Sequence, residues 1–204
     1  ARLRGYQNSA YAEKYEKLVR KVQSRERQLE SGSDRLTTKV AENAAKLMAY
    51  KDEYEVARLF SSGEFIEELK NTFTGDYRLV FNLAPPLISK NDPVTGEPRK
   101  MQFGPWMLSA FGVLARLKFL RGTWLDIFSY TQERKQERAL IDKYSETIDK
   151  LLAGLTSEKL EKAVQIAALP EKIRGFGHVK ERSIKSTELE WKQLLEEYEN
   201  AADA

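Results

Sequence analysis

The sequence contains no cysteine and only one histidine, His178, and these two scarcities exclude several kinds of chemistry. Without cysteine the chain offers no thiolate ligand for an iron–sulfur cluster or for zinc, no disulfide and no cysteine nucleophile. One histidine excludes a metal site built from paired imidazoles. A Ser–His–Asp triad would need His178 as its base, and no GxSxG motif supplies the serine.

Nucleotide-binding and membrane signals are also missing. The sequence contains neither GxGxxG nor GxxxxGK(S/T), the standard phosphate-binding loops. No apolar run approaches the ~20 residues that a membrane-spanning helix needs, and no signal-peptide pattern is present. We therefore expect a cytoplasmic protein with no membrane partner. The first residue is alanine and a helical pattern is already under way there, so we interpret the chain as part of a larger protein.

Charge is abundant: Asp, Glu, Lys and Arg make up 32% of the 204 residues, against 41% hydrophobic residues. Long stretches of Glu, Lys, Ala and Leu are typical of a mostly helical protein. We predict a mainly α fold, a helical domain with a long N-terminal helix and one small antiparallel β-hairpin. The net charge of +3 is too small to argue for nucleic acid, and we expect no nucleic-acid partner.

Apolar residues at helical intervals predict the individual helices. Residues 3–30 lack proline and carry a thin, tyrosine-rich apolar stripe, which predicts a helix of about 40 Å that packs poorly within the chain. We therefore divide the chain into an N-terminal helical arm, residues 1–33, and a helical domain, residues 34–204. The remaining helices are expected at residues 36–60, 61–73, 105–119, 131–152, 156–169 and 178–200. The strongly apolar helix that begins at Pro105 is the predicted buried centre.

The middle of the chain predicts the β-hairpin, at about residues 77–103. Tyr77 to Leu83 alternates large apolar residues with Arg, Val and Asn, which is a strand pattern. Asn91 to Pro98 is dense in turn residues, and Lys100 to Phe103 supplies a partner strand.

The segment Ile173–Glu181, which we call the glycine loop, is the candidate functional site. Its candidate residues are Arg174, Gly175, Gly177, His178 and Lys180. Two glycines two residues apart indicate a turn or a close backbone approach, and the helix that follows directs free N–H groups into a basic segment. Glycines at a helix start near basic residues are common, and the usual role of such a loop is that of a purely structural turn. If the loop has a function, it either binds an anion or docks on a neighbouring domain. We favour docking over anion binding, because nothing in the sequence selects phosphate over carboxylate.

The residues alone indicate no catalytic site and no metal site. Carboxylate pairs such as Glu67 and Glu68 are adjacent in sequence, so they point to different sides of a helix. The tryptophans and phenylalanines fit a core better than a platform for stacking bases, which needs aromatic residues interleaved with Lys and Arg.

Several segments, taken together and in order, resemble a known family. The segments are Gly5–Asn8 followed by Ala10–Ala12, KLMAYKDEYEVARLF (46–60), GDYRLVFNLAPPL (75–87), GEPRKMQFGPWM (96–107), LRGTWLDIFSYTQERKQERALI (120–141) and LPEKIRGFGHVKE (169–181). They resemble the C-terminal region of the long-chain indolepyruvate ferredoxin oxidoreductases, members of the 2-oxoacid:acceptor oxidoreductase family. The resemblance covers most of the chain. Ile127 and Ser129 stand where proline and glycine are expected, a departure confined to a loop.

The resemblance implies a parent enzyme that oxidatively decarboxylates arylpyruvates to acyl-CoA and reduces ferredoxin. That enzyme uses thiamine diphosphate, Mg²⁺, 4Fe–4S clusters and coenzyme A. Its thiamine-binding GDG…N pattern and its cluster cysteines belong to other parts of the polypeptide, so we expect no cofactor and no catalytic residue in this segment. Its expected partners are the other domains or chains of the parent oxidoreductase, with ferredoxin as the parent's electron acceptor.

A second interpretation assigns the chain to another functional class, that of non-enzymatic interaction proteins. A helical domain with a long basic arm also fits a protein-interaction adaptor unrelated to redox chemistry. Cysteine clusters and a thiamine motif in the sequence before Ala1 would favour the oxidoreductase, and their absence would favour the adaptor.

Overall fold

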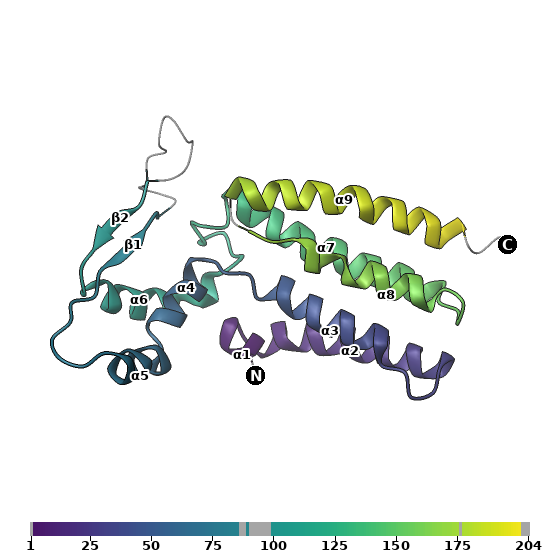
Figure 1. The fold of residues 1–204 in the computed structure, drawn as a ribbon, viewed down its shortest axis with the longest axis horizontal. Helices are drawn as coiled ribbons and strands as arrows, with labels where there is room; N and C mark the ends of the chain where they lie inside the picture. The colour runs from purple at the N-terminus through teal and green to yellow at the C-terminus, as the bar shows by residue number, and fades with distance from the viewer. Residues whose placement is uncertain (1, 86–88, 90–98, 176, 201–204) are drawn as a thin grey trace. The chain divides into compact units, whose positions relative to one another are not determined.

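The structure is a computed structural model that describes residues 2–85, 89, 99–175 and 177–200. It confirms the predicted class, mainly α with one two-stranded antiparallel sheet (Figure 1). In chain order the elements are α1 (Arg2–Tyr6), α2 (Ser9–Leu29), α3 (Arg35–Met48), α4 (Glu53–Phe60), α5 (Gly63–Thr72), β1 (Phe81–Leu83), β2 (Met101–Phe103), α6 (Met107–Arg116), the 3-10 helix η1 (Leu117–Leu120), α7 (Gln132–Ala153), α8 (Leu160–Ala168), the 3-10 helix η2 (Leu169–Lys172) and α9 (Gly177–Asn200). None of the described helices is both long enough and apolar enough to cross a membrane.

The chain divides into two compact units. Residues 1–50 and 132–204 form the first, which we call the helical unit, and residues 51–131 form the second, the hairpin unit. These compact units differ from the expected division at residue 33. Residues 1–33 belong with the helical unit because Val22, on α2, is fully buried in its core and the Tyr15 hydroxyl donates to the Ala41 carbonyl of α3.

The core of the helical unit lies between α2, α3, α7, α8 and α9 (Figure 1). Trp191, on α9, is its largest fully buried side chain, and it meets Tyr144 of α7 edge to face with ring centroids 6.0 Å apart. The Trp191 indole N–H donates to Thr147 Oγ1 at 3.1 Å, and the Tyr144 hydroxyl donates to the Ala167 carbonyl at 2.9 Å. These aromatic rings are therefore buried with their polar atoms satisfied.

The N-terminal segment is two helices instead of the single one expected over residues 3–30. It breaks between α1 and α2, where the Asn8 side chain accepts a hydrogen bond from the Tyr11 N–H at 2.8 Å. Asparagine satisfies a free N–H group in this way at the start of many helices. The expected poor packing was wrong, because the stripe on α2 that includes Ala12 and Val22 is buried.

Glu26 of α2 caps the N-terminus of α3. Its side chain is fully buried, and it accepts hydrogen bonds from the Leu36 and Thr37 N–H groups at 2.9 and 2.8 Å and from the Thr37 and Ser33 hydroxyls at 2.7 and 2.9 Å. Burial alone would raise the pKa of Glu26, but these hydrogen bonds outweigh it and lower the pKa below its usual value. Asp34, the residue at the cap position of α3, makes no such bond.

The helix expected over residues 36–60 is also divided, between α3 and α4. The Asp52 carboxylate accepts the Glu55 N–H at 2.8 Å and so starts α4. This break is where the helical unit gives way to the hairpin unit. Similarly, Ser62 caps α5, by accepting the Phe65 N–H.

The hairpin unit contains the predicted two-stranded sheet, with strands shorter than expected. Phe81 pairs with Phe103 and Leu83 pairs with Met101, while residues 77–80 form no strand. The turn-rich segment Asn91–Pro98 lies outside the described residues. A small core holds the sheet against α4 and α6, with Phe81 and Phe111 edge to face at 5.3 Å.

The apolar helix after Pro105 is not the buried centre that the sequence predicts. Of the residues of α6, Met107 and Phe111 are buried, whereas Val113 is exposed, as is Trp106 just before the helix. The larger core belongs to the helical unit, because five helices enclose it.

Candidate functional site

The glycine loop has the backbone that its glycines predict. Gly175 and Gly177 adopt φ of +98° and +52°, in the region that favours glycine, and α9 begins at Gly177. A Cβ atom on Gly175 would lie 2.7 Å from Val179 Cγ1, so the first turn of α9 approaches the loop too closely for any side chain there. His178 lies exposed in that first turn.

Arg174 is exposed, and its backbone is anchored to α9. Its N–H donates to Ser183 Oγ at 3.1 Å, and the Ser183 hydroxyl donates in turn to the Lys172 carbonyl at 2.7 Å. The Arg174 side chain turns back along the chain, with Nε donating to the Glu171 carbonyl at 3.0 Å. The backbone that leads into Arg174 is therefore fastened to α9 through Ser183.

Lys46, on α3, is a third cation at the glycine loop, and no local sequence pattern pointed to it. Its ammonium group donates to the carbonyls of Pro170 at 2.7 Å and Ile173 at 3.0 Å. Burial lowers the pKa of Lys46, and the positive charges of Arg174 and Lys180 lower it further. Lys46 thus ties the entry of the loop to α3, which lies more than a hundred residues earlier in sequence.

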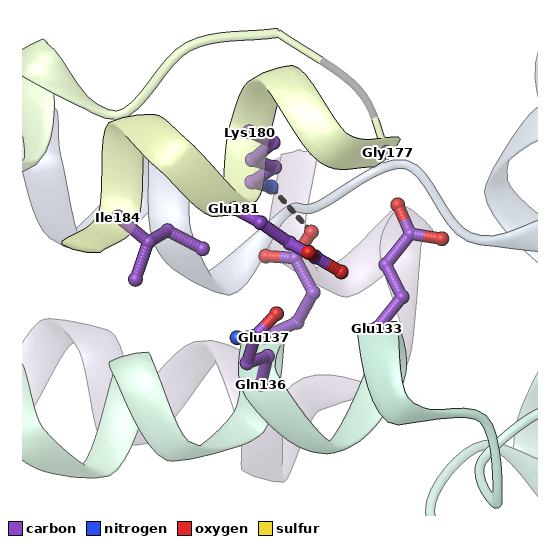
Figure 2. Close-up of a pocket in the computed structure, with 7 residues that line it drawn as sticks. All are labelled: Glu133, Gln136, Glu137, Gly177, Lys180, Glu181 and Ile184. Atoms are coloured by element: carbon purple, nitrogen blue, oxygen red, sulfur yellow. Dashed lines mark hydrogen bonds and ion pairs between the residues drawn. The ribbon is translucent and has the colours of Figure 1, made fainter. Parts of the chain in front are cut away.

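Lys180 is engaged within the protein, because it forms an ion pair with Glu137 of α7 (Figure 2). The two side chains border a cavity of about 80 Å³ between α7 and α9. The cavity is lined by Glu133, Gln136, Glu137, Gly177, Lys180, Glu181 and Ile184 (Figure 2). Three carboxylates and one ammonium group line the cavity, so the net negative charge of the lining disfavours binding of an anion.

The predicted site residues are therefore only partly brought together. Gly177 and Lys180 line the cavity, whereas Arg174, Gly175 and His178 do not. In the part of the chain that the structure describes, no group of three or more His, Asp or Glu side chains is placed to hold a metal ion.

A second candidate lies in the hairpin unit at residues 121–131, which we call the tryptophan loop. Arg121 begins it and is buried, with its guanidinium donating to the buried Asp52 carboxylate at 2.8 Å. The same guanidinium lies over the Tyr54 ring, 5.5 Å from its centroid. Gly122 follows with a φ of +76°, which turns the chain sharply. The start of the loop is thus fixed to α4.

Asp126 fixes the middle of the tryptophan loop. Its buried carboxylate accepts hydrogen bonds from the Tyr54 hydroxyl at 3.1 Å and from the Gly122 and Phe128 N–H groups at 2.8 and 3.2 Å. Burial raises the pKa of Tyr54, and the negative charge of Asp126 raises it further. Ser129 Oγ adds a bond to the Asp126 carbonyl. A segment without helix or strand is therefore held by buried polar side chains.

This fixed backbone presents apolar side chains to solvent. Trp124 is 79% exposed, and Leu125, Ile127 and Tyr130 are also exposed. The Tyr130 hydroxyl donates to the Trp124 carbonyl at 2.9 Å, which restrains the two aromatic residues together. Large apolar side chains displayed on an ordered loop are typical of interaction surfaces.

The exposed apolar side chains of the described residues are concentrated in the hairpin unit. They are Leu59, Phe73, Tyr77, Val80, Trp106, Val113, Phe119, Trp124, Leu125, Ile127 and Tyr130 in the hairpin unit, against Val179 and Leu189 in the helical unit. The tryptophan loop was not predicted from the sequence. The available signal was a stretch, GTWLDIFSY, that is rich in aromatic and aliphatic residues but lacks helical or strand periodicity.

Comparison with protein families matches residues 1–193 to a family of unknown function, DUF6537. The chain belongs to this family. Searches among curated proteins and among solved structures found no match.

Proposed function

We propose that the chain is a non-catalytic structural and interface domain of an indolepyruvate (2-oxoacid) ferredoxin oxidoreductase. The parent enzyme would oxidatively decarboxylate arylpyruvates to acyl-CoA and reduce ferredoxin, with thiamine diphosphate, Mg²⁺, 4Fe–4S clusters and coenzyme A held by its other parts. The parent is suggested by the ordered series of segments from residues 5 to 181 that resembles the C-terminal region of those enzymes.

The tryptophan loop is the observation that carries the interface role. Burying apolar surface yields about 25 cal/mol per Å², and fixing a flexible segment offsets part of that gain. The Asp52–Arg121 pair and the bonds to Asp126 already fix this loop. Burial of Trp124 and Ile127 against another domain would therefore contribute most of its free energy to assembly.

The glycine loop fits the same role better than it fits phosphate binding. Lys180 is paired with Glu137, and Lys46 donates to backbone carbonyls, so both cations are engaged. Arg174 is exposed and donates to the Glu171 carbonyl through Nε, which leaves the outer nitrogens of its guanidinium to meet a carboxylate on a neighbouring domain.

The test uses the full-length parent polypeptide with Trp124→Ala and Ile127→Ala combined. We expect weakened assembly, followed by sedimentation velocity, and arylpyruvate turnover that falls in proportion to the unassembled fraction. Leu189→Ala, which truncates an exposed apolar residue of the helical unit, is the matched control and should leave both unchanged. Intact assembly in the double variant would refute the interface role.

The glycine loop has its own test in the same enzyme, the combined change Arg174→Ala and Lys180→Ala. Docking predicts weaker assembly with an unchanged KM for coenzyme A. A raised KM with intact assembly would instead show that the loop binds phosphate.

The second candidate is an adaptor role outside redox chemistry. The same exposed apolar surface favours it, because such a surface serves a protein–protein contact whether or not the partner is a redox enzyme. The two differ in what precedes Ala1 in the parent reading frame. Cysteine clusters and a thiamine-binding motif there support the oxidoreductase, and a reading frame without them supports the adaptor.

A further inference from the structure

The hairpin unit has a strongly segregated distribution of charge. Five cations and no carboxylate occur between Arg99 and Leu125. The cations are Arg99, Lys100, Arg116, Lys118 and Arg121. Arg121 is buried and neutralised by Asp52, whereas Arg116 is exposed at the end of α6. In contrast, α5 of the same unit exposes three carboxylates, Glu64, Glu67 and Glu68.

The exposed apolar side chains accompany these cations. Val113 and Arg116 are three residues apart and lie on one face of α6. Trp106, the N-cap residue of α6, is seven residues before Val113 and in line with that face, and all three residues are exposed. Phe119 of η1 is 64% exposed, and Trp124 follows five residues later in the tryptophan loop. The opposite face of α6 is occupied, because Met107 and Phe111 are packed in the core of the unit.

We infer that the hairpin unit binds an acidic surface of a protein partner that has an apolar centre. The binding surface comprises the basic apolar face, defined by Trp106, Val113, Arg116 and Phe119, and the exposed Trp124 of the tryptophan loop. The inference takes from the proposed function only that the hairpin unit is an interface, and it does not depend on the identity of the parent enzyme. Apolar burial supplies the affinity, and complementary charge selects and orients the partner.

Two features favour a protein over a nucleic acid or a lipid bilayer. Affinity for nucleic acids comes mainly from contacts to many phosphates, whereas here exposed aromatic and aliphatic side chains predominate. The buried Asp52–Arg121 pair gives the tryptophan loop a fixed shape, and a fixed shape benefits a partner that is itself folded more than it benefits a fluid bilayer.

The carboxylates of α5 add orientation. An acidic partner is attracted to Arg116 and repelled by Glu67 and Glu68. Like charges brought together at an interface are unfavourable, so these carboxylates disfavour binding of the partner over α5.

The experiment uses the complete 204-residue chain and two synthetic helical peptides that contain no tryptophan. One peptide has Leu and Phe along one face with Glu on both flanks, and the other has Lys in place of every Glu. Trp106 and Trp124 are exposed in the hairpin unit and Trp191 is buried, so binding should shift the emission of the chain to shorter wavelength. The expected result is a shift with the Glu peptide that weakens as salt is added.

Charge reversal provides the decisive comparison. Arg116→Glu should weaken binding of the Glu peptide by on the order of tenfold and favour the Lys peptide. Lys185→Glu, which reverses an exposed charge on α9 of the helical unit, is the control and should change neither affinity.

The inference is overturned if neither peptide binds, if both bind equally, or if phosphatidylglycerol vesicles or oligothymidylate bind more tightly than the Glu peptide. The assembly measurement on the full-length enzyme involves neither peptide. The proposed function and this inference can therefore fail separately.

Discussion

The two units of this chain use their tryptophans in opposite ways. In the helical unit Trp191 is 1% exposed and its indole N–H is bonded to Thr147, whereas in the hairpin unit Trp106 and Trp124 are 62% and 79% exposed. The helical unit also encloses its core with five helices, while the core of the hairpin unit lies between α4, α6 and two short strands. The comparison suggests that the helical unit is the stable scaffold and that the hairpin unit carries the surface that meets other molecules.

Removing the central side chain of the scaffold should have the largest effect. Trp191→Ala deletes a fully buried indole and leaves the Thr147 hydroxyl without its donor. Buried tryptophan-to-alanine changes cost about 3–5 kcal/mol, because the packing of the ring is removed and a cavity remains in its place. Urea unfolding followed by circular dichroism measures this loss. A loss of under about 1 kcal/mol would mean that the helical unit is not the scaffold.

Breaking the ion pair that fixes the tryptophan loop is expected to cost nearly as much free energy, but to affect only the structure around that loop. Asp52→Asn keeps a side chain that caps α4 well and removes the charge opposite Arg121, which stays buried. Breaking a buried pair in this way costs about 3–5 kcal/mol. Amide hydrogen exchange should show lost protection around residues 121–131 with little change in α7 and α9.

Asp149→Asn is the control for that experiment. Asp149 pairs with Lys21 in the helical unit, and both side chains are more than half exposed. Exposed ion pairs contribute at most about 1 kcal/mol, so exchange should be unchanged. Equal effects of the two substitutions would contradict the view that the buried pair orders the loop.

Glu26 should give the helical unit a specific dependence on pH. The pKa of Glu26 is lowered in the folded state, so its contribution to stability is complete above the unfolded value of about 4.3 and is lost as pH falls through the folded value. Glu26→Gln removes the charge that accepts four hydrogen bonds and should cost about 1–3 kcal/mol near neutral pH.

The measurement is the free energy of unfolding from pH 7 to pH 3. The difference between the native chain and Glu26→Gln should shrink as the medium becomes more acidic. Glu13→Gln, at an exposed position of the same helix, should show no such convergence. A difference that is constant over the whole range would show that the charge of Glu26 is not what stabilises the start of α3.

Periodicity predicted the fold class and most of the helices, because those features depend on neighbours in sequence. The division between α3 and α4 was not predicted, because neither glycine nor proline lies there. The break depends on Asp52, which pairs with Arg121, a residue 69 positions later in the sequence. Likewise, the glycines predicted the shape of the glycine loop. Its partners Lys46 and Glu137 come from other helices and leave no local pattern.

The tryptophan loop could not be predicted for a related reason. Both Trp124 and Trp191 have apolar and charged residues nearby in sequence, so local composition does not distinguish the exposed tryptophan from the buried one. Only the helical spacing around Trp191 favours burial, and the absence of such spacing around Trp124 does not reveal a loop held by Asp126 and Tyr54. Exposure here is a product of tertiary structure.

The smallest effect on stability, and the most informative one for function, is expected when the exposed tryptophans are changed. Trp106→Ser and Trp124→Ser remove indoles that are mostly in solvent, so the free energy of unfolding should change by no more than about 0.5 kcal/mol. The same changes should reduce the binding of a hydrophobic dye such as ANS to the folded chain, because they remove apolar surface. A large loss of stability would show that the two indoles pack within the protein and would remove the contrast between the units. Unchanged stability with lower dye binding would show that the exposed apolar surface of the chain lies on the hairpin unit.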